Sequence, residues 1–130
     1  MMRRFALGLL LCAIACSDDI VGASTTGTYS LRTINGAALP YTITSGTSAG
    51  TVIVDDVISL YQGGTFAGTR RTRAAANAPI QTVNTTGTWT VGLGNTLSFR
   101  INETGATRIA VGDGVKMTIV EEGLSMVFSK

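Results

Sequence analysis

Short alternating runs of hydrophobic and polar residues fill the chain from Gly27 onward. Period-two alternation puts successive side chains on opposite faces of an extended strand, so each run predicts a β-strand with one buried face. Gly, Asn and Asp separate the runs and mark turns. The runs cover 28–34, 41–44, 52–61, 65–73, 81–91, 97–101, 107–111, 115–121 and 124–128. No helix is predicted after Gly27.

Only short connections join these runs, and short connections favour antiparallel pairing of successive strands. An all-β fold follows. A small up-and-down antiparallel β-barrel of about eight strands is the simplest arrangement that leaves no exposed sheet edge. A sandwich of two sheets is the alternative. The Asp55-Asp56 pair shifts the alternation within its run, which predicts a β-bulge or a tight connection there.

A glycine–threonine–aromatic triplet occurs three times, as Gly27-Thr28-Tyr29, Gly64-Thr65-Phe66 and Gly87-Thr88-Trp89. The unequal spacings exclude a repeat array. Glycine within a β-rich sequence often marks a sharp bend at a barrel corner. We therefore expect a bend at each glycine, followed by a strand whose aromatic side chain enters the core.

A different pattern precedes the strands. Met1–Arg4 is basic, and Phe5–Ala15 is apolar but too short to span a bilayer, which takes about 20 residues. This order is typical of a secretory signal peptide. Ala13-Ile14-Ala15-Cys16 resembles the bacterial lipobox, whose cysteine is diacylated before cleavage. An ordinary signal peptide, cut near Ala15 or Ala23, is the alternative.

The lipobox resemblance implies three segments: a signal peptide over 1–15, a lipidated Cys16 with a polar tether over 16–26, and one domain over 27–130. It also implies a bacterial cell-envelope protein whose partner is the membrane. Ser17 follows the cysteine, and by resemblance to enterobacterial sorting this favours the outer membrane, at its periplasmic face or the cell surface.

The charge balance argues against nucleic-acid binding. The chain has ten basic and eight acidic residues, and removal of Arg3 and Arg4 would leave eight of each. A general nucleic-acid binder needs a clear positive excess.

The residues of common catalytic sites are missing. Histidine is absent and the one cysteine of the predicted mature chain is the lipidated one, so Ser-His-Asp and Cys-His arrangements are excluded. Asp55-Asp56 and Glu121-Glu122 are adjacent pairs whose members point to opposite faces of a strand, and we expect them to be solvated. A calcium site at Asp55 or Asp56 is the alternative. We therefore predict no enzyme, no cofactor and no metal site, and assign Asp113 to a hairpin turn.

The one cluster of charge is Thr69–Arg73. Arg70 shares a strand face with Phe66, so if Phe66 points inward, Arg70 reaches the barrel mouth and could meet an anionic ligand. The alternative is a solvated strand end with Arg71 and Arg73 near anionic lipid headgroups.

The segments 27–40, 87–91, 95–99 and 124–130 resemble those of small bacterial lipoproteins with a lipocalin-like domain. The resemblance implies a calycin-type β-barrel and brings no established ligand. We predict a barrel that binds a small apolar or amphipathic ligand, with Tyr29, Arg70, Trp89 and Phe99 as candidate ligand contacts. The alternative is a structural or interaction module of the envelope with a solid barrel. The sequence indicates no protein partner.

Overall fold

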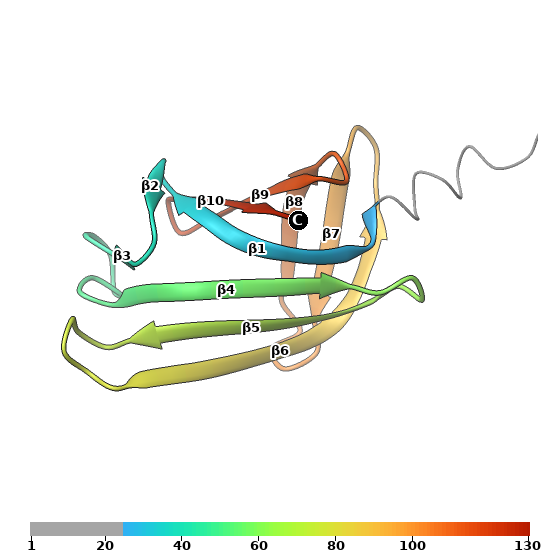
Figure 1. The fold of residues 1–130 in the computed structure, drawn as a ribbon. Helices are drawn as coiled ribbons and strands as arrows, with labels where there is room; N and C mark the ends of the chain where they lie inside the picture. Colours follow the sequence, from blue (N-terminus) through green and yellow to red (C-terminus); the bar gives the residue numbers. More distant parts are fainter. Residues whose placement is uncertain (1–24) are drawn as a thin grey trace, which may run out of the picture.

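The computed structural model describes residues 25–130, and almost all of them lie in strands or in turns between strands (Figure 1). The predicted signal peptide and the predicted lipid attachment at Cys16 lie outside the described residues. The strands are β1 (Gly27–Ile34), β2 (Ala37–Ala38), β3 (Tyr41–Thr42), β4 (Val52–Leu60), β5 (Thr65–Arg73), β6 (Ile80–Val91), β7 (Thr96–Ile101), β8 (Thr107–Gly112), β9 (Lys116–Glu121) and β10 (Leu124–Ser129). Within residues 25–130, no helix is long and apolar enough to cross a membrane.

Eight of these strands form a closed antiparallel barrel. Each strand pairs with its neighbour from β4 through to β10, and β1 pairs with both β10 and β4. The short strands β2 and β3 belong to the connection between β1 and β4. The predicted up-and-down barrel is confirmed, and closure through the β1–β4 pairing excludes the two-sheet sandwich.

Inward positions of the barrel strands build one hydrophobic core. Leu97, Phe99 and Ile101 of β7 alternate with exposed or partly exposed neighbours, and all three are buried. Phe66 and Phe99 meet edge to face, with ring centroids 5.2 Å apart. Such buried aromatic side chains dominate core energetics, and truncation of one to alanine typically costs about 3–5 kcal/mol.

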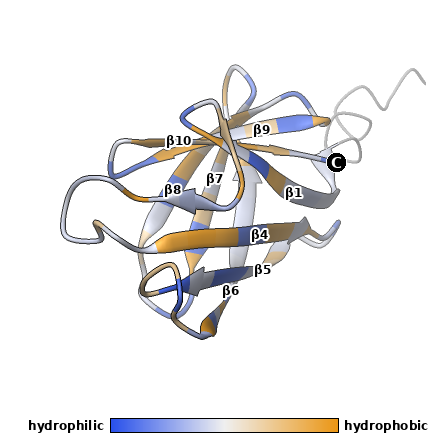
Figure 2. Cartoon of the chain, turned by 60° about the vertical axis from the view of Figure 1, so that its left-hand side comes forward, coloured by the Kyte–Doolittle hydropathy of each residue, from blue (hydrophilic) through white to orange (hydrophobic). Residues whose placement is uncertain are grey.

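The predicted irregularity near Asp55 is present as a register shift between Ile53 and Asp55, where β4 pairs with β5. A β-bulge changes which residues face inward. Beyond it, Asp56 takes an inward position together with Ile58 and Leu60. Figure 2 shows one hydrophilic band across the otherwise hydrophobic β4.

The aromatic residues of the three triplets are all buried, as predicted, but the bend prediction is wrong at Gly87. Gly87 lies inside β6, with no break before it. A Cβ there would lie 1.9 Å from the Arg100 carbonyl oxygen and 2.6 Å from Phe66 Cε1. Gly87 is therefore required because β7 and the Phe66 ring approach the backbone closely.

The barrel wall is incomplete beside β6. β7 pairs with β6 only over Gly87–Val91, whereas β5 pairs with β6 from Ile80 onward. One more backbone hydrogen bond joins Asn102 N to Thr86 O, at 2.9 Å. Before Thr86, β6 has one partner strand, so the wall is open between this half of β6 and the strands β8 and β9.

Candidate ligand cavity

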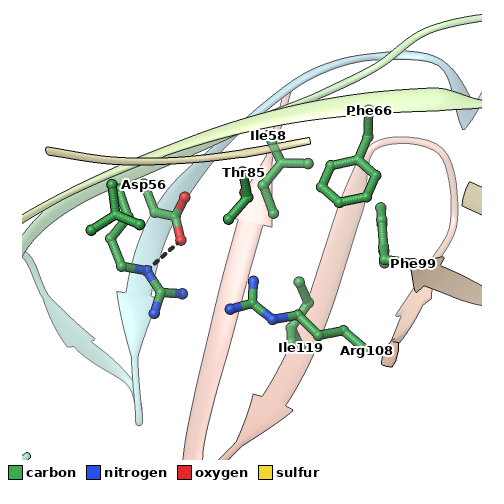
Figure 3. A pocket seen from close by; sticks show the side chains of 9 residues that line it. Asp56, Ile58, Phe66, Thr85, Phe99, Arg108 and Ile119 are labelled. Atoms are coloured by element: carbon green, nitrogen blue, oxygen red, sulfur yellow. Dashed lines mark hydrogen bonds and ion pairs between the residues drawn. The ribbon is translucent and has the colours of Figure 1, made fainter. Parts of the chain in front are cut away.

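A cavity of about 170 Å³ lies inside the barrel (Figure 3). Six strands contribute side chains to its wall. They are Asp56 and Ile58 of β4, Phe66 and Arg70 of β5, Val83 and Thr85 of β6, Phe99 of β7, Arg108 of β8 and Ile119 of β9. Apolar cavities of about 150 Å³ in proteins stay dry and accept a molecule the size of benzene. This cavity therefore has room for a ring or a short branched chain.

Charged side chains form a continuous chain of ion pairs along one side of the cavity. Arg70 Nε donates to Asp56 Oδ2 at 2.9 Å, and Arg70 Nη2 donates to Glu121 Oε1 at 3.0 Å. The other oxygen of Glu121, Oε2, lies 3.0 Å from Arg108 Nε. Two cations and two anions alternate in this order, so their formal charges balance.

The environment of Asp56 and Arg70 changes their titration. Asp56 is only 4% exposed, and burial raises its pKa by more than the adjacent Arg70 lowers it. Burial by itself would lower the pKa of Arg70, but Asp56 and Glu121 together raise it above its usual value. Arg70 therefore stays charged inside the barrel because two carboxylates hold it there.

Arg108 differs from Arg70 in having unused donors. Its Nε is occupied by Glu121, but neither of its Nη atoms has a hydrogen-bond acceptor among the described residues. The side chain is 27% exposed, and Figure 3 shows its guanidinium turned into the cavity. A guanidinium with open donors can bind a carboxylate, sulfonate or phosphate oxygen.

The cavity continues outward into an open groove of about 720 Å³. Val83, Thr85 and Arg108 line both spaces, so they surround the passage between them. The groove follows the gap in the wall beside β6. Exposed Ile109 and Val120 form part of its outer rim.

Glu103 fixes one edge of this gap. From the turn between β7 and β8, its Oε1 accepts hydrogen bonds from the Thr86 backbone N at 2.9 Å and from Thr86 Oγ1 at 2.8 Å. The Thr86 hydroxyl, followed by the backbone N–H, lowers the pKa of Glu103. The carboxylate therefore replaces the ladder hydrogen bond that a longer β7 would supply.

Two of the four candidate ligand contacts line the cavity and two do not. Arg70 and Phe99 are in its wall. Tyr29 is fully buried at the barrel end where β1 begins, where its hydroxyl donates to Thr25 O at 2.6 Å. Trp89 lies at the same end, and its Nε1 donates to Tyr61 O at 3.0 Å.

The expected solvation of both acidic pairs is wrong for Asp56, which is buried, and holds only in part for Glu121, whose side chain is 23% exposed and pairs with Arg70 and Arg108. The bulge in β4 turns Asp56 inward, and Glu121 shares the inward face of β9 with Ile119. Their neighbours follow the expectation better: Glu122 is exposed, and Asp55 pairs with Arg71 on the outer face. One feature of the sequence could have predicted this arrangement. An arginine that points into a barrel needs carboxylate partners there, so an inward Arg70 indicates inward acidic residues.

No protein-family model, no curated protein and no solved structure matches this chain. Across residues 25–130, no three His, Cys, Asp or Glu side chains are grouped so that they could hold a metal ion.

Proposed function

We propose that this protein is a lipocalin-like lipoprotein of the bacterial cell envelope, anchored through Cys16, whose barrel binds a small amphipathic molecule. The observation that carries the binding proposal is the cavity that opens sideways into the groove beside β6. Its inner wall is apolar at Ile58, Phe66 and Phe99, and its passage is marked by a cation with unused donors, Arg108. This combination suits a ligand with one apolar end and one anionic or polar group.

The geometry indicates how such a ligand would lie. A ring or a short branched chain fills the space beside Phe66 and Phe99. The polar group stays near Arg108, and the remainder of the molecule follows the groove. Binding is favoured over catalysis because the interior carboxylates, Asp56 and Glu121, are tied to arginines. Neither is positioned as a free acid or base.

A structural or interaction module of the envelope is the second candidate. It rests on the groove rim, where Val83, Ile109 and Val120 are each more than half exposed. Exposed apolar side chains grouped in this way often mark interaction sites. In this candidate the outer surface carries the function, and the 170 Å³ cavity has no part in it.

A blocking substitution tests the binding proposal. Among residues 25–130, the buried hydrophobic core side chains belong to residues 29–128, so a chain that begins at Ser17 keeps them. We expect this chain to bind 1-anilinonaphthalene-8-sulfonate, with a rise in its fluorescence. Val83→Trp should weaken binding about tenfold or more, because the larger side chain fills the passage. Thr82→Trp, on the outer face of the same strand, is the matched control and should bind the dye normally. Equal binding by both variants would place the dye elsewhere.

A further inference from the structure

The barrel end at which β1 begins, here called the tether end, brings three turns together. These are the turns between β4 and β5 (61–64), β6 and β7 (92–95), and β8 and β9 (113–115). Gly27 pairs with Leu60, Lys130 N donates to Val115 O at 3.0 Å, and Gly112 N donates to Asn95 O at 2.9 Å. In Figure 1 this end lies on the right-hand side, where the chain enters β1.

Each of the three turns exposes one large apolar side chain. Tyr61 is 51% exposed, Leu93 is 95% exposed and Val115 is 59% exposed. We call these three residues the turn patch. Val91 and Val111, at the strand ends next to two of these turns, add further exposed apolar surface. At the opposite end, the described turns (35–36, 43–51, 74–79, 102–106 and 122–123) expose no large hydrophobic side chain, and the exposed apolar residues there, Ile80 and Val120, lie within strand ends.

We propose that the turn patch inserts into the lipid surface to which the chain is tethered. This inference rests on the proposed anchor at Cys16, because the polar segment Ser17–Thr26 joins the barrel at this end. Ten residues span at most about 35 Å, which keeps the tether end close to the membrane. Three apolar tips on separate turns, one of them an aromatic with a polar hydroxyl, suit the boundary between headgroups and acyl chains.

Basic residues lie at both ends of the barrel. Lys116 and Lys130 lie at the tether end, where the Asp113 carboxylate accepts hydrogen bonds from the backbone N–H groups of Val115 and Lys116. Arg73 lies at the other end, seven residues along β5 from Phe66, or about 23 Å. Arginines therefore occur far from the tether, whereas turns with exposed apolar tips occur only beside it among the described residues.

The proposed orientation directs the opening beside β6 away from the membrane. Val83 precedes Val91 by eight residues of β6, which is about 26 Å along the strand. The passage into the cavity would then face the aqueous side, and a ligand would enter from there rather than from the bilayer.

Single tryptophans in the full-length chain test the proposal. Trp89 is the one native tryptophan, so Trp89→Phe gives a silent background. Leu93→Trp and Val115→Trp are placed in that background, with Ile80→Trp as the matched control. Ile80 is 41% exposed, lies at the start of β6 at the opposite end of the barrel, and is not part of the cavity or the groove. Each purified chain is reconstituted on phosphatidylethanolamine–phosphatidylglycerol vesicles with and without brominated lipid.

Bromine should quench the emission of the two patch variants about twofold or more, and leave the Ile80→Trp emission nearly unchanged. Vesicle flotation and the mass of the N-terminal peptide report the anchor separately. Acylated chains that float with all three tryptophans unquenched would overturn the patch and keep the anchor. Quenching of the patch variants without acylation would keep the patch and overturn the anchor. Dimers that bury Leu93 in place of lipid contact would overturn the proposal in favour of a second copy.

Discussion

At the residue scale, the interior of this barrel is organised around a partly buried cation and the buried carboxylate that it pairs with. Arg70 is held by Asp56 and Glu121, and Arg108 shares Glu121 with it. Removal of one member of a buried ion pair leaves an uncompensated charge, which is much costlier than loss of the pair itself. Arg71, the next residue, forms its pair with Asp55 on the outer face, where water screens it. Adjacent arginines of one strand thus have opposite roles.

Replacement of Arg70 by methionine should lower the free energy of unfolding by about 3–5 kcal/mol, because Asp56 would remain buried without its partner. Arg71→Met is the matched control and should change stability little. Urea denaturation of the two variants measures the difference. The double variant Asp56→Leu/Arg70→Met should recover most of the loss, since it removes both charges. Equal effects of Arg70→Met and Arg71→Met would contradict the buried ion-pair account.

At the element scale, one half of β6 is part of the closed barrel wall and the other half borders the opening to the cavity. The second half of β6 pairs closely with β7 at Gly87, and its first half leaves the gap through which the cavity meets the groove. The β6–β7 pairing ends at Thr86, whose backbone N–H donates to the Glu103 carboxylate instead of to a neighbouring strand. The position of the opening is therefore set by how far β7 extends along β6.

A methyl group at Gly87 tests the close approach of β6 and β7. Gly87→Ala should destabilise the fold by about 3 kcal/mol, near the upper end for overpacked positions, because the Arg100 backbone and the Phe66 ring must both move. Gly92→Ala is the control, since a Cβ there would lie 3.7 Å from its nearest neighbours. Thermal unfolding of the two variants should separate them clearly. A Gly87→Ala protein as stable as the Gly92→Ala protein would show that the approach is not tight.

Acid should weaken the hydrogen bonds that the Glu103 carboxylate accepts from Thr86. The folded-state pKa of Glu103 is lowered, so its contribution to stability is present above the unfolded pKa of about 4.3 and is lost as pH falls through the folded value. Glu103→Gln should therefore be less stable than the native chain at pH 6, and the difference should shrink toward pH 3. Urea midpoints at both pH values measure it. If the stability difference between the two proteins stays constant with pH, the charge of the Glu103 carboxylate does not contribute to its interaction with Thr86.

At the scale of the whole molecule, local patterns predict the strands and turns well. The alternation in Leu97, Phe99 and Ile101 predicts β7, and Asp113 caps its hairpin turn as expected through hydrogen bonds from Val115 N and Lys116 N. Closure also follows, because successive antiparallel strands leave two edges that can pair.

The contents of the barrel are harder to predict from the sequence. Arg70 meets Asp56 from 14 residues away and Glu121 from 51 residues away, so no local pattern joins them. Their meeting depends on strand register across the barrel and on the bulge in β4. Tyr29 and Trp89 have the apolar character of ligand contacts, but the register places them at the tether end. Residue type predicts burial, whereas register decides which buried residues surround the cavity.

Native mass spectrometry of the chain that begins at Ser17, purified without detergent and then exposed to an envelope lipid extract, tests the central claim most directly. We predict an adduct that survives native conditions, disappears on denaturation and is absent from Val83→Trp. A bare protein mass before and after exposure, in the native sequence and the variant alike, would contradict a ligand-binding barrel.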